Sequence, residues 1–355
     1  MSDLPTAGSV HAGVPIAGSP HLGYPYAWGG PPLRGTLRAS PEDFFVDEDL
    51  GIDADGAGEH VFVRVEKRGA NTDWVARELA RVAGVRPDAV SYAGMKDRHA
   101  VTRQTFSLHL PGKSEPDWSA LAHEEFRVLG HARHGRKLKR GALQGNRFRI
   151  VVRDVQGDPA QADRVLASIV ADGVPNYFGE QRFGRDAANV ERARAMFAGK
   201  RVQRHERSLL LSAARSQLFN AVLARRVERG DWNRPLEGDV WMLDGTHSIF
   251  GPEPLSPEIA ARCVAGDIAP TAPLWGEGEL RSSGTVAQLE RDVAAAYSDI
   301  AAGLVANGLR QERRALVLRP RQLAMRRVGA DSLELEFYLN SGAYATVLLR
   351  EIVGS

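Results

Sequence analysis

The chain of 355 residues contains a single cysteine, Cys263. One cysteine excludes an internal disulfide and any metal site built from several thiolates, and we expect it to be a small buried residue. No apolar run approaches the roughly 18 to 20 residues that a membrane-spanning helix needs. The N-terminus also lacks a basic stretch followed by an apolar one, which is typical of a secretory signal. We therefore expect a cytoplasmic protein without membrane contact.

Lysine is scarce as well, with six lysines among 46 basic residues, so that 40 are arginines. A GC-rich genome would explain this excess, but arginine is also the better residue for bidentate phosphate contacts. Two stretches are strongly basic: 127–149 has eight Arg or Lys and no acid, and 310–327 has seven Arg against Glu312 alone. A basic run is usually a solvated face, but two separate runs favour a surface for a polyanion such as nucleic acid.

The familiar cofactor and metal motifs are incomplete. The stretch 112–114 has the Gly-Lys-Ser end of a phosphate-binding loop, but Ser107 stands where the loop requires glycine. The glycines of 276–278 lack the third member of a dinucleotide fingerprint. His131 and His134 have a spacing that zinc ligands can have, but they lie among cations without a thiolate or carboxylate beside them. We expect no metal and no cofactor.

Hydrophobic periodicity predicts strands first, helices next and strands again. Residues 1–33, rich in Gly, Pro and Ala, should form an extended lead-in. Alternating patterns then predict strands near 60–66, 90–95, 102–110, 126–132 and 148–152, with a helix between the first two that begins at Asn71 or Thr72. Helical spacing follows at 159–172, 187–198, 208–229 and 286–306, and strands return at 315–318 and 333–339. This order predicts an α+β fold on a mainly antiparallel sheet.

Two segments suggest chemistry. In 93–102, Asp97 lies between Lys96 and Arg98 on a turn between two predicted strands, where the two cations favour an ionised nucleophile or base. The alternative is an aspartate that only organises its own turn. The second segment, 176–185, alternates aromatics with Arg and glycine, which suits stacking on RNA bases and equally suits packing at a domain junction.

These segments and several others resemble one known family. The matching stretches, in family order over about residues 34–352, are Ser40-Pro41-Glu42-Asp43-Phe44, 93–102, Gly145-Asn146-Arg147-Phe148, 176–184, 211–216 and Gly342-Ala343-Tyr344-Ala345-Thr346 with Leu349-Arg350-Glu351. Each stretch is weak alone, but six in order are specific. The chain is similar to the tRNA pseudouridine synthase D family, TruD.

The resemblance implies a fold and a reaction. The fold is α+β, with a pseudouridine-synthase catalytic domain on a mainly antiparallel sheet formed by 1–171 and 319–355 and interrupted by a mixed, helix-rich TRUD insertion domain, 172–318. The reaction is an isomerisation of uridine to pseudouridine in tRNA, typically uridine 13. It implies tRNA as the partner, no cofactor and no obligate protein partner.

The resemblance also implies site residues. Asp97 is the essential aspartate, Phe44 and Tyr344 fall at uridine-pocket positions, Asn146 at a polar position of that pocket, and Phe148 at its wall or in the core. The implied RNA contacts are basic side chains around this pocket: Arg38, Lys96, Arg98, Arg136, Lys137, Lys139 and Arg140. Three places depart from the family pattern: Tyr344 replaces the usual Phe, Arg38 replaces the usual Lys, and Asn340-Ser341 replaces a more typical Leu-Pro-containing approach to the Tyr344 loop.

Two other functions would use similar features. A non-catalytic RNA-binding or RNA-folding module would need the same basic runs and aromatics, but it would not depend on Asp97. A different RNA-modifying enzyme, such as a methyltransferase, would need a nucleotide-type cofactor site, for which the sequence offers no glycine-rich fingerprint. The pseudouridine synthase is the hypothesis that the sequence favours.

Overall fold

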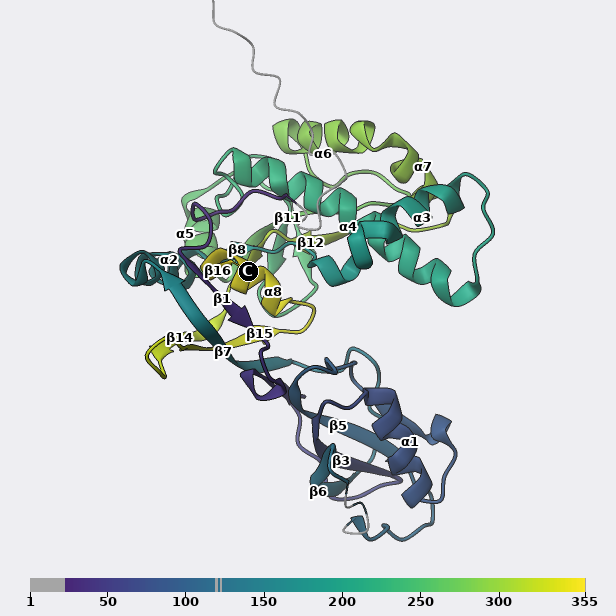
Figure 1. Ribbon diagram of the computed structural model, residues 1–355. Coiled ribbons are helices and arrows are strands. Elements are labelled where there is room, and N and C mark those ends of the chain that lie inside the picture. The colour runs from purple at the N-terminus through teal and green to yellow at the C-terminus, as the bar shows by residue number, and fades with distance from the viewer. Residues whose placement is uncertain (1–22, 119–120, 122, 355) are drawn as a thin grey trace, which may run out of the picture.

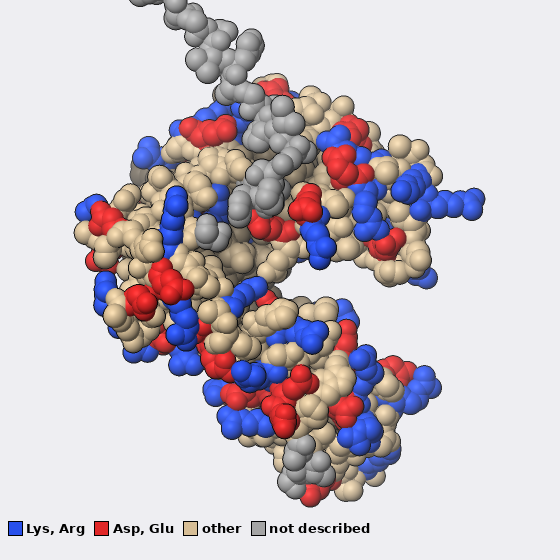
Figure 2. All heavy atoms as spheres, in the orientation of Figure 1, with Lys and Arg blue, Asp and Glu red and all other residues tan. Residues whose placement is uncertain are grey.

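The computed structural model describes residues 23–118, 121 and 123–354 and shows two lobes joined by a narrow neck (Figure 1). The smaller lobe carries α1, β3, β5 and β6, and the larger lobe carries the other helices and both ends of the described chain. Figure 2 shows a hollow between the lobes, open on the side where α3 and α4 face the smaller lobe. Of the predicted lead-in, residues 1–22 lie outside the described part, 23–32 form no helix or strand, and Leu33 begins β1.

One ten-stranded sheet runs through both lobes of the described chain. Its main path has the order β14-β15-β7-β2-β5-β3-β6, while β1, β4 and β16 join at the sides. These strands are β1 (Leu33–Leu37), β2 (Phe44–Asp49), β3 (His60–Arg68), β4 (Val90–Tyr92), β5 (Val101–His109), β6 (Phe126–His134), β7 (Gly145–Gly157), β14 (Arg321–Arg327), β15 (Leu333–Asn340) and β16 (Val353–Gly354). All pairings are antiparallel except β1 with β16 and β2 with β5, which agrees with the predicted α+β class.

The parallel pair in the neck determines where the site forms. Phe45 on β2 lies opposite Val101 on β5. Parallel neighbours begin at the same edge of a sheet, so the segments that precede β2 and β5 must lie side by side. Those segments contain Arg38 and Asp97. The neck is therefore where residues 59 positions apart in the sequence meet.

The smaller lobe folds as its periodicity predicts. Val61, Val63 and Val65 point into one hydrophobic core from β3. Helix α1 (Thr72–Val82) covers this core and begins where predicted, since the Asn71 side chain accepts a hydrogen bond from the Asp73 N–H. The predicted strands 90–95 and 126–132 are present as β4 and β6, with ends shifted by two or three residues.

The helices of the larger lobe match three of the four predictions. They are α2 (Pro159–Asp172), α3 (Ala188–Phe197), α4 (Arg204–Glu228), α5 (Pro257–Ala265), α6 (Gly284–Ala296), α7 (Ser298–Ala306) and α8 (Ala345–Ile352). The predicted single helix 286–306 is wrong, because Tyr297 leaves the helical region at φ −118°, ψ 42° and separates α6 from α7. Residues 230–285, where no periodic pattern was recognised, contain β9 (Trp241–Leu243), β10 (Ile249–Phe250), α5 and β11 (Ile268–Leu274).

The two ends of the predicted insertion, 172–318, are joined by hydrogen bonds. Residue 172 ends α2, and directly afterwards β8 (Val174–Pro175) pairs antiparallel with β13 (Val317–Leu318). Leu316 separates β13 from β12 (Glu312–Ala315), so the predicted strand 315–318 is two short strands. One hydrophobic core continues across these ends, and the domain boundaries stay a prediction.

In the described chain, no helix combines the length and the apolar character that crossing a bilayer requires.

Candidate active site

Asp97 lies in the loop between β4 and β5 and is held by contacts from both lobes. Its Oδ1 accepts a hydrogen bond from the His99 N–H at 3.0 Å, so the side chain does organise its own turn. Its Oδ2 forms an ion pair with Arg38 Nη2 at 2.9 Å. The backbone oxygen of Asp97 accepts a hydrogen bond from Lys67 Nζ at 2.9 Å. With 27% of its side chain exposed, the carboxylate is fixed in place and still open to a ligand.

Arg38 connects this carboxylate to the aromatic residues that the sequence predicts. It directly follows β1 with a φ of 60°, a left-handed conformation that costs a non-glycine residue about 1 kcal/mol or more. Its guanidinium carbon lies 4.2 Å from the centroid of the Phe44 ring. Arg38 therefore contacts Asp97 and Phe44 at the same time, while the Phe44 ring is only 4% exposed.

Strand β7 places Asn146 and Phe148 on the same face as Phe44. Phe148 meets Phe44 edge-to-face at 6.3 Å and stacks on Phe337 at 5.1 Å. Two residues along the strand, Asn146 pairs in register with Glu48 of β2. The Oδ1 atom of Asn146 is enclosed and has no hydrogen-bond partner within the described structure. A buried acceptor without a partner is costly, and a ligand N–H would satisfy it.

The described contacts of Tyr344 are with a different segment, 176–184. Tyr344 directly precedes α8, and its hydroxyl accepts a hydrogen bond from Arg182 Nη2 at 2.5 Å. Its ring meets Phe178 edge-to-face at 6.2 Å. None of the contacts described for Tyr344 reaches Asp97, Phe44 or Asn146. The Tyr344 hydroxyl thus has a partner in the segment 176–184.

Lys96 does not fit its predicted role in RNA contact. Its side chain is 7% exposed, and its ammonium forms an ion pair at 2.5 Å with Glu48, which is fully buried. Glu48 also accepts a hydrogen bond from the Thr105 N–H. Since a charge already paired inside the protein is not available to a phosphate, Lys96 fixes the Asp97 loop against β2 instead. Arg98 is exposed and donates to the Gly69 oxygen.

The other predicted RNA contacts lie on the basic loop, residues 135–144. Arg136, Lys137 and Lys139 are exposed, and none has a carboxylate partner in the part of the chain that is described. Arg140 lies 5.3 Å from the centroid of the Tyr92 ring. The Gly141 N–H donates to the oxygen of Ala93 at 2.7 Å, so the loop is anchored to the start of the Asp97 segment.

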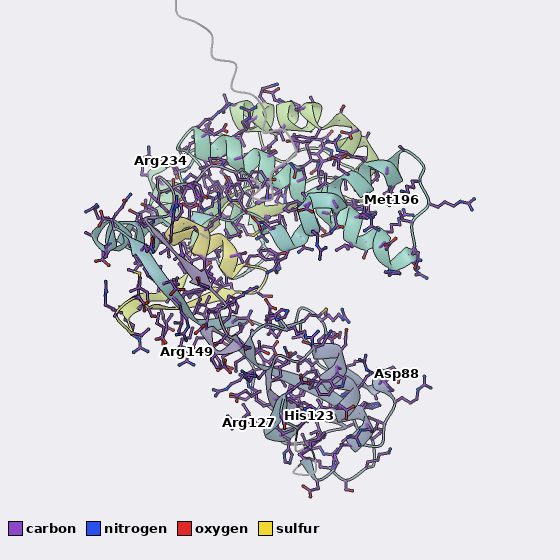
Figure 3. All side chains as sticks on the ribbon, viewed as in Figure 1. Asp88, His123, Arg127, Arg149, Met196 and Arg234 are labelled. Carbon is purple, nitrogen blue, oxygen red and sulfur yellow. The ribbon has the colours of Figure 1, made fainter. Side chains whose placement is uncertain are left out.

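In the second basic stretch, 310–327, three of the seven arginines form ion pairs with acids of this chain. Arg313 pairs with the buried Glu290, Arg321 with Asp244, and Arg326 with Glu334. The sequence-based expectation of a polyanion surface is wrong for Arg313, because its guanidinium is buried and paired with Glu290, whereas the side chains of Arg321 and Arg326 are at least half exposed. Arg314 differs from these three, because its guanidinium donates only to neutral oxygen atoms among the described residues. In Figure 3, Arg149 marks the neck and Arg127 the smaller lobe.

A cavity of about 890 Å³ begins at Arg38 and extends into the larger lobe. Arg34, Phe178, Thr346 and Arg350 are among its lining residues. No cluster of three or more potential ligands suited to a metal ion occurs among the residues described. His131 and His134 instead contact Glu115 and Asp55.

Sequence reasoning missed three residues around this site. Lys67 donates a hydrogen bond to the backbone oxygen of Asp97. Arg182 and Arg314 donate hydrogen bonds to Tyr344 and Gly342, on the loop before α8. Arg182 belonged to an aromatic segment already of interest, and Arg314 to a basic stretch, but neither pattern distinguishes these arginines from their neighbours. Lys67 could have been found, because it continues the alternating pattern of Val61, Val63 and Val65.

The sequence of the chain matches one known protein family over most of its length. The family model described as tRNA pseudouridine synthase D (TruD) matches residues 23–195 and 188–352. Proteins named tRNA pseudouridine synthase D from Xanthomonas campestris pv. campestris (strain B100) and Methylococcus capsulatus are each 50% identical, over 344 and 329 residues. Each alignment covers 92% of this chain and 93% of the relative.

A solved structure supports the same fold. The crystal structure of a TruD protein from Methanosarcina mazei superimposes with a TM-score of 0.70 at 24% identity, covering 92% of this chain and 95% of the other. At that identity the likeness shows the fold alone. The sequence matches over nearly the whole chain carry the assignment: the chain belongs to the tRNA pseudouridine synthase D family.

Proposed function

We propose that this protein isomerises a uridine of tRNA to pseudouridine and that Asp97 is its catalytic residue. One observation carries the proposal: a partly exposed carboxylate at the neck is fixed by Arg38 from one lobe and by its own loop from the other. The names of the relatives supply the reaction. Uridine 13 is the position we expect, from the family resemblance.

The reaction itself needs no co-reactant. The bond from C1′ to N1 breaks, a bond from C1′ to C5 forms, the proton leaves C5 and a proton is gained at N1, so atoms and electrons balance within the substrate. Asp97 can attack C1′, add to the uracil ring, or act as a base. In each case the ion pair with the Arg38 guanidinium keeps the carboxylate oriented.

The neighbouring residues suit a flipped uracil. Extruding a base costs a few kcal/mol, and stacking on a planar group recovers about 1 to 3 kcal/mol. Arg38 covers the Phe44 ring, so we propose that the uracil stacks on this Arg38–Phe44 pair rather than on a bare ring. The free Oδ1 of Asn146 would accept the uracil N3–H. Phe148 would support Phe44 from the side.

The test of the reaction is tritium release from C5-tritiated uridine in an unmodified tRNA transcript, with no cofactor added. Wild type should release tritium and leave pseudouridine at one site, whereas Asp97→Asn should release none. Asp88→Asn is the matched control, because Asp88 is exposed and its only described ion pair is with Arg86. Release by the Asp97→Asn protein would contradict the role of Asp97.

The alternative, a non-catalytic RNA-binding or RNA-folding module, has its own outcome in this assay. It predicts tight tRNA binding by wild type, no tritium release from any tRNA, and identical behaviour of the Asp97→Asn variant. We also propose the basic loop as a phosphate contact. Replacing Arg136, Lys137, Lys139 and Arg140 together by Gln should flatten the dependence of tRNA affinity on salt. An unchanged slope would count against the loop.

A further inference from the structure

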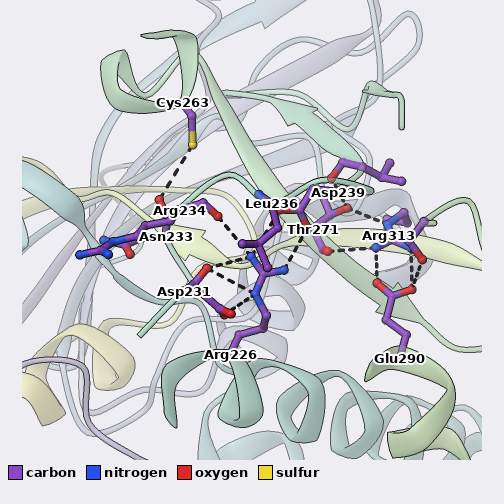
Figure 4. A network of polar contacts seen from close by, with 12 residues as sticks. Arg226, Asp231, Asn233, Arg234, Leu236, Asp239, Cys263, Thr271, Glu290 and Arg313 are labelled. Carbon is purple, nitrogen blue, oxygen red and sulfur yellow. Dashed lines mark hydrogen bonds and ion pairs between the residues drawn. The ribbon is translucent and has the colours of Figure 1, made fainter. Parts of the chain in front are cut away.

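Two adjacent arginines of β12, Arg313 and Arg314, have opposite electrostatic surroundings. Arg313 is buried and its guanidinium is neutralised by Glu290, which also accepts a hydrogen bond from Ser282 (Figure 4). Arg226, the other deeply buried arginine of this network, is likewise paired, with Asp231 and Asp239. Burying a charge is costly unless an opposite charge accompanies it. These pairs show the usual solution.

Arg314 has no such partner among the described residues. Its guanidinium donates to the oxygen and Oδ1 of Asn176 and to the oxygen of Gly342, all neutral acceptors. Its guanidinium carbon lies 4.3 Å from the centroid of the Phe178 ring. The pKa of Arg314 is lowered to about 10, mainly by burial; the Tyr344 hydroxyl opposes this shift and the charge of Arg182 adds to it. The group remains a cation at neutral pH and is only partly exposed.

Arg182 is a second cation of the same kind. It donates to Ser212 Oγ at 2.8 Å and to the Tyr344 hydroxyl at 2.5 Å. Its guanidinium carbon lies 5.4 Å from the centroid of the same Phe178 ring. No carboxylate pairs with it within the described chain, and its Nε is buried without a hydrogen-bond partner. Two guanidinium groups thus share one aromatic ring and lack a counter-charge.

Both cations act on the loop that carries Tyr344. Arg314 reaches Gly342, and Arg182 reaches Tyr344 itself. The backbone of Gly179 passes directly against this loop, since a Cβ there would come within 3.0 Å of Thr346 Oγ1. Like charges at short range repel, which makes the arrangement costly for the free protein. An anion binding between them would remove that cost.

We propose that Arg182 and Arg314 form a binding site for one phosphate group of the RNA backbone, adjacent to the nucleotide that Asp97 acts on. The inference rests on the proposed function, because tRNA supplies the anion. Planar guanidinium groups match a phosphate's oxygens bidentately. Phosphate binding here would neutralise the two charges that already join the Tyr344 loop to the 176–184 segment.

Salt dependence of tRNA affinity separates this proposal from a purely structural role. Each phosphate contact contributes about 0.9 to the slope of log K against log salt for duplex and about 0.7 for single strands. Arg314→Gln and Arg182→Gln should each lower the slope, and Arg314→Lys should restore most of it. Arg164→Gln, which removes an exposed arginine of α2, should leave the slope unchanged. If both Gln variants weaken binding but keep the wild-type slope, the arginines only hold the loop and the proposal is wrong.

A second measurement locates the phosphate. A methylphosphonate, which is uncharged, replaces in turn the linkage on each side of the uridine that the wild type converts. One neutral linkage should weaken binding to wild type about tenfold and have less than a twofold effect on Arg314→Gln, because the contact is already lost. Additive losses at both linkages would overturn the placement beside the target nucleotide.

Tritium release by the wild type, measured on the same RNA, keeps the two proposals apart. Release together with equal slopes for all variants would leave the proposed function intact and overturn the phosphate site. Reduced slopes for the Gln variants without tritium release would support the phosphate site and contradict the proposed reaction. The salt titration therefore remains informative whatever the enzyme assay shows.

Discussion

The ammonium group of Lys67 lies 2.9 Å from the backbone oxygen of Asp97 and 2.8 Å from that of Ala70. The Lys67 side chain is completely buried, and no carboxylate in the described chain forms an ion pair with it. Burial lowers its pKa to about 8, while the charge of Asp97 acts in the opposite direction. A buried cation that binds the backbone of the proposed catalytic residue is a positioning residue for it.

Replacing Lys67 by Met should slow catalysis without loosening RNA binding. Hydrogen bonds from charged groups contribute about 1.5 to 3 kcal/mol, so we expect kcat for tritium release to fall roughly tenfold or more, with KM changed by less than about twofold. Lys113→Met is the control, because Lys113 also donates to a backbone oxygen, that of Gly84, but on the surface. A wild-type kcat in Lys67→Met, with the protein folded, would contradict the positioning role.

The low pKa of Lys67 also predicts how stability depends on pH. Below pH 8 both folded and unfolded chains hold the proton, but between pH 8 and the ordinary lysine value of 10.5 the unfolded chain binds more protons. Stability contributed by this group therefore rises with pH in that window. Between pH 8 and 10.5 the unfolding free energy of the wild type should therefore increase, relative to that of Lys67→Met, by at most about 3 kcal/mol. Urea titrations from pH 7 to 10 would measure it, and a flat difference would contradict the shifted pKa.

Lys67 shows how far sequence patterns reach. Val61, Val63 and Val65 recur at every second position, which indicates that they lie on the buried face of β3. Lys67 is the next residue on that same face. Read consistently, the pattern predicts a buried lysine, which is rare without a functional reason. The local elements of the smaller lobe were predictable for the same reason, because strand periodicity and the Asn71 cap depend only on neighbours.

Long-range pairings explain what the sequence did not reveal. From its sequence neighbours, Lys96 is expected to be an exposed cation. In the structure, the pairing of β2 with β5 brings Glu48 beside it. Arg313 and Arg314 are indistinguishable by type, and only the packing of α6 against β12 gives Glu290 to one of them. The resemblance to a family identified Asp97 and Phe44 as site residues, but the role of Arg38 as their link depends on three-dimensional contacts.

The Lys96–Glu48 pair should be essential for stability rather than for RNA contact. Removing one partner of a buried ion pair costs about 3 to 5 kcal/mol, since the other charge stays buried alone. We expect Lys96→Met to lose about that much in urea unfolding, and the double variant Lys96→Met, Glu48→Gln to recover part of the loss. Arg86→Gln, which breaks an exposed pair with Asp88, should cost less than about 1 kcal/mol. A neutral effect of Lys96→Met on stability would show that the pair is not intact in solution.

The N-terminal strap, residues 23–32, is fastened to α8 by the family-matching Arg350 and Glu351. Glu351 Oε2 accepts hydrogen bonds from the backbone N–H groups of Ala27 and Trp28, at 3.1 and 3.3 Å. Arg350 donates to the backbone oxygens of Tyr24 and Pro25. Burial raises the pKa of the Glu351 carboxyl, so its charged form is the less favoured one inside the protein.

Glu351→Gln and Glu351→Ala should therefore behave differently. Gln keeps an acceptor oxygen and carries no charge, so the strap should stay bound and stability at pH 8 should equal or exceed that of wild type. Wild type should regain stability relative to Gln as the pH falls through the raised pKa, where its carboxyl takes up a proton that the unfolded chain has not yet bound. Ala leaves two partly buried N–H groups unpaired and should cost about 2 kcal/mol.

Limited chymotrypsin digestion, read by mass spectrometry, reports on the strap directly, because Tyr26 and Trp28 are cleavage sites within it. Cleavage should be faster in Glu351→Ala than in wild type and unchanged in Glu351→Gln. Glu191→Ala, an exposed change on α3, is the control. Equal protection in all four proteins would show that Arg350 and the packing of Trp28, whose indole N–H donates to the Gly173 oxygen, hold the strap without the carboxylate.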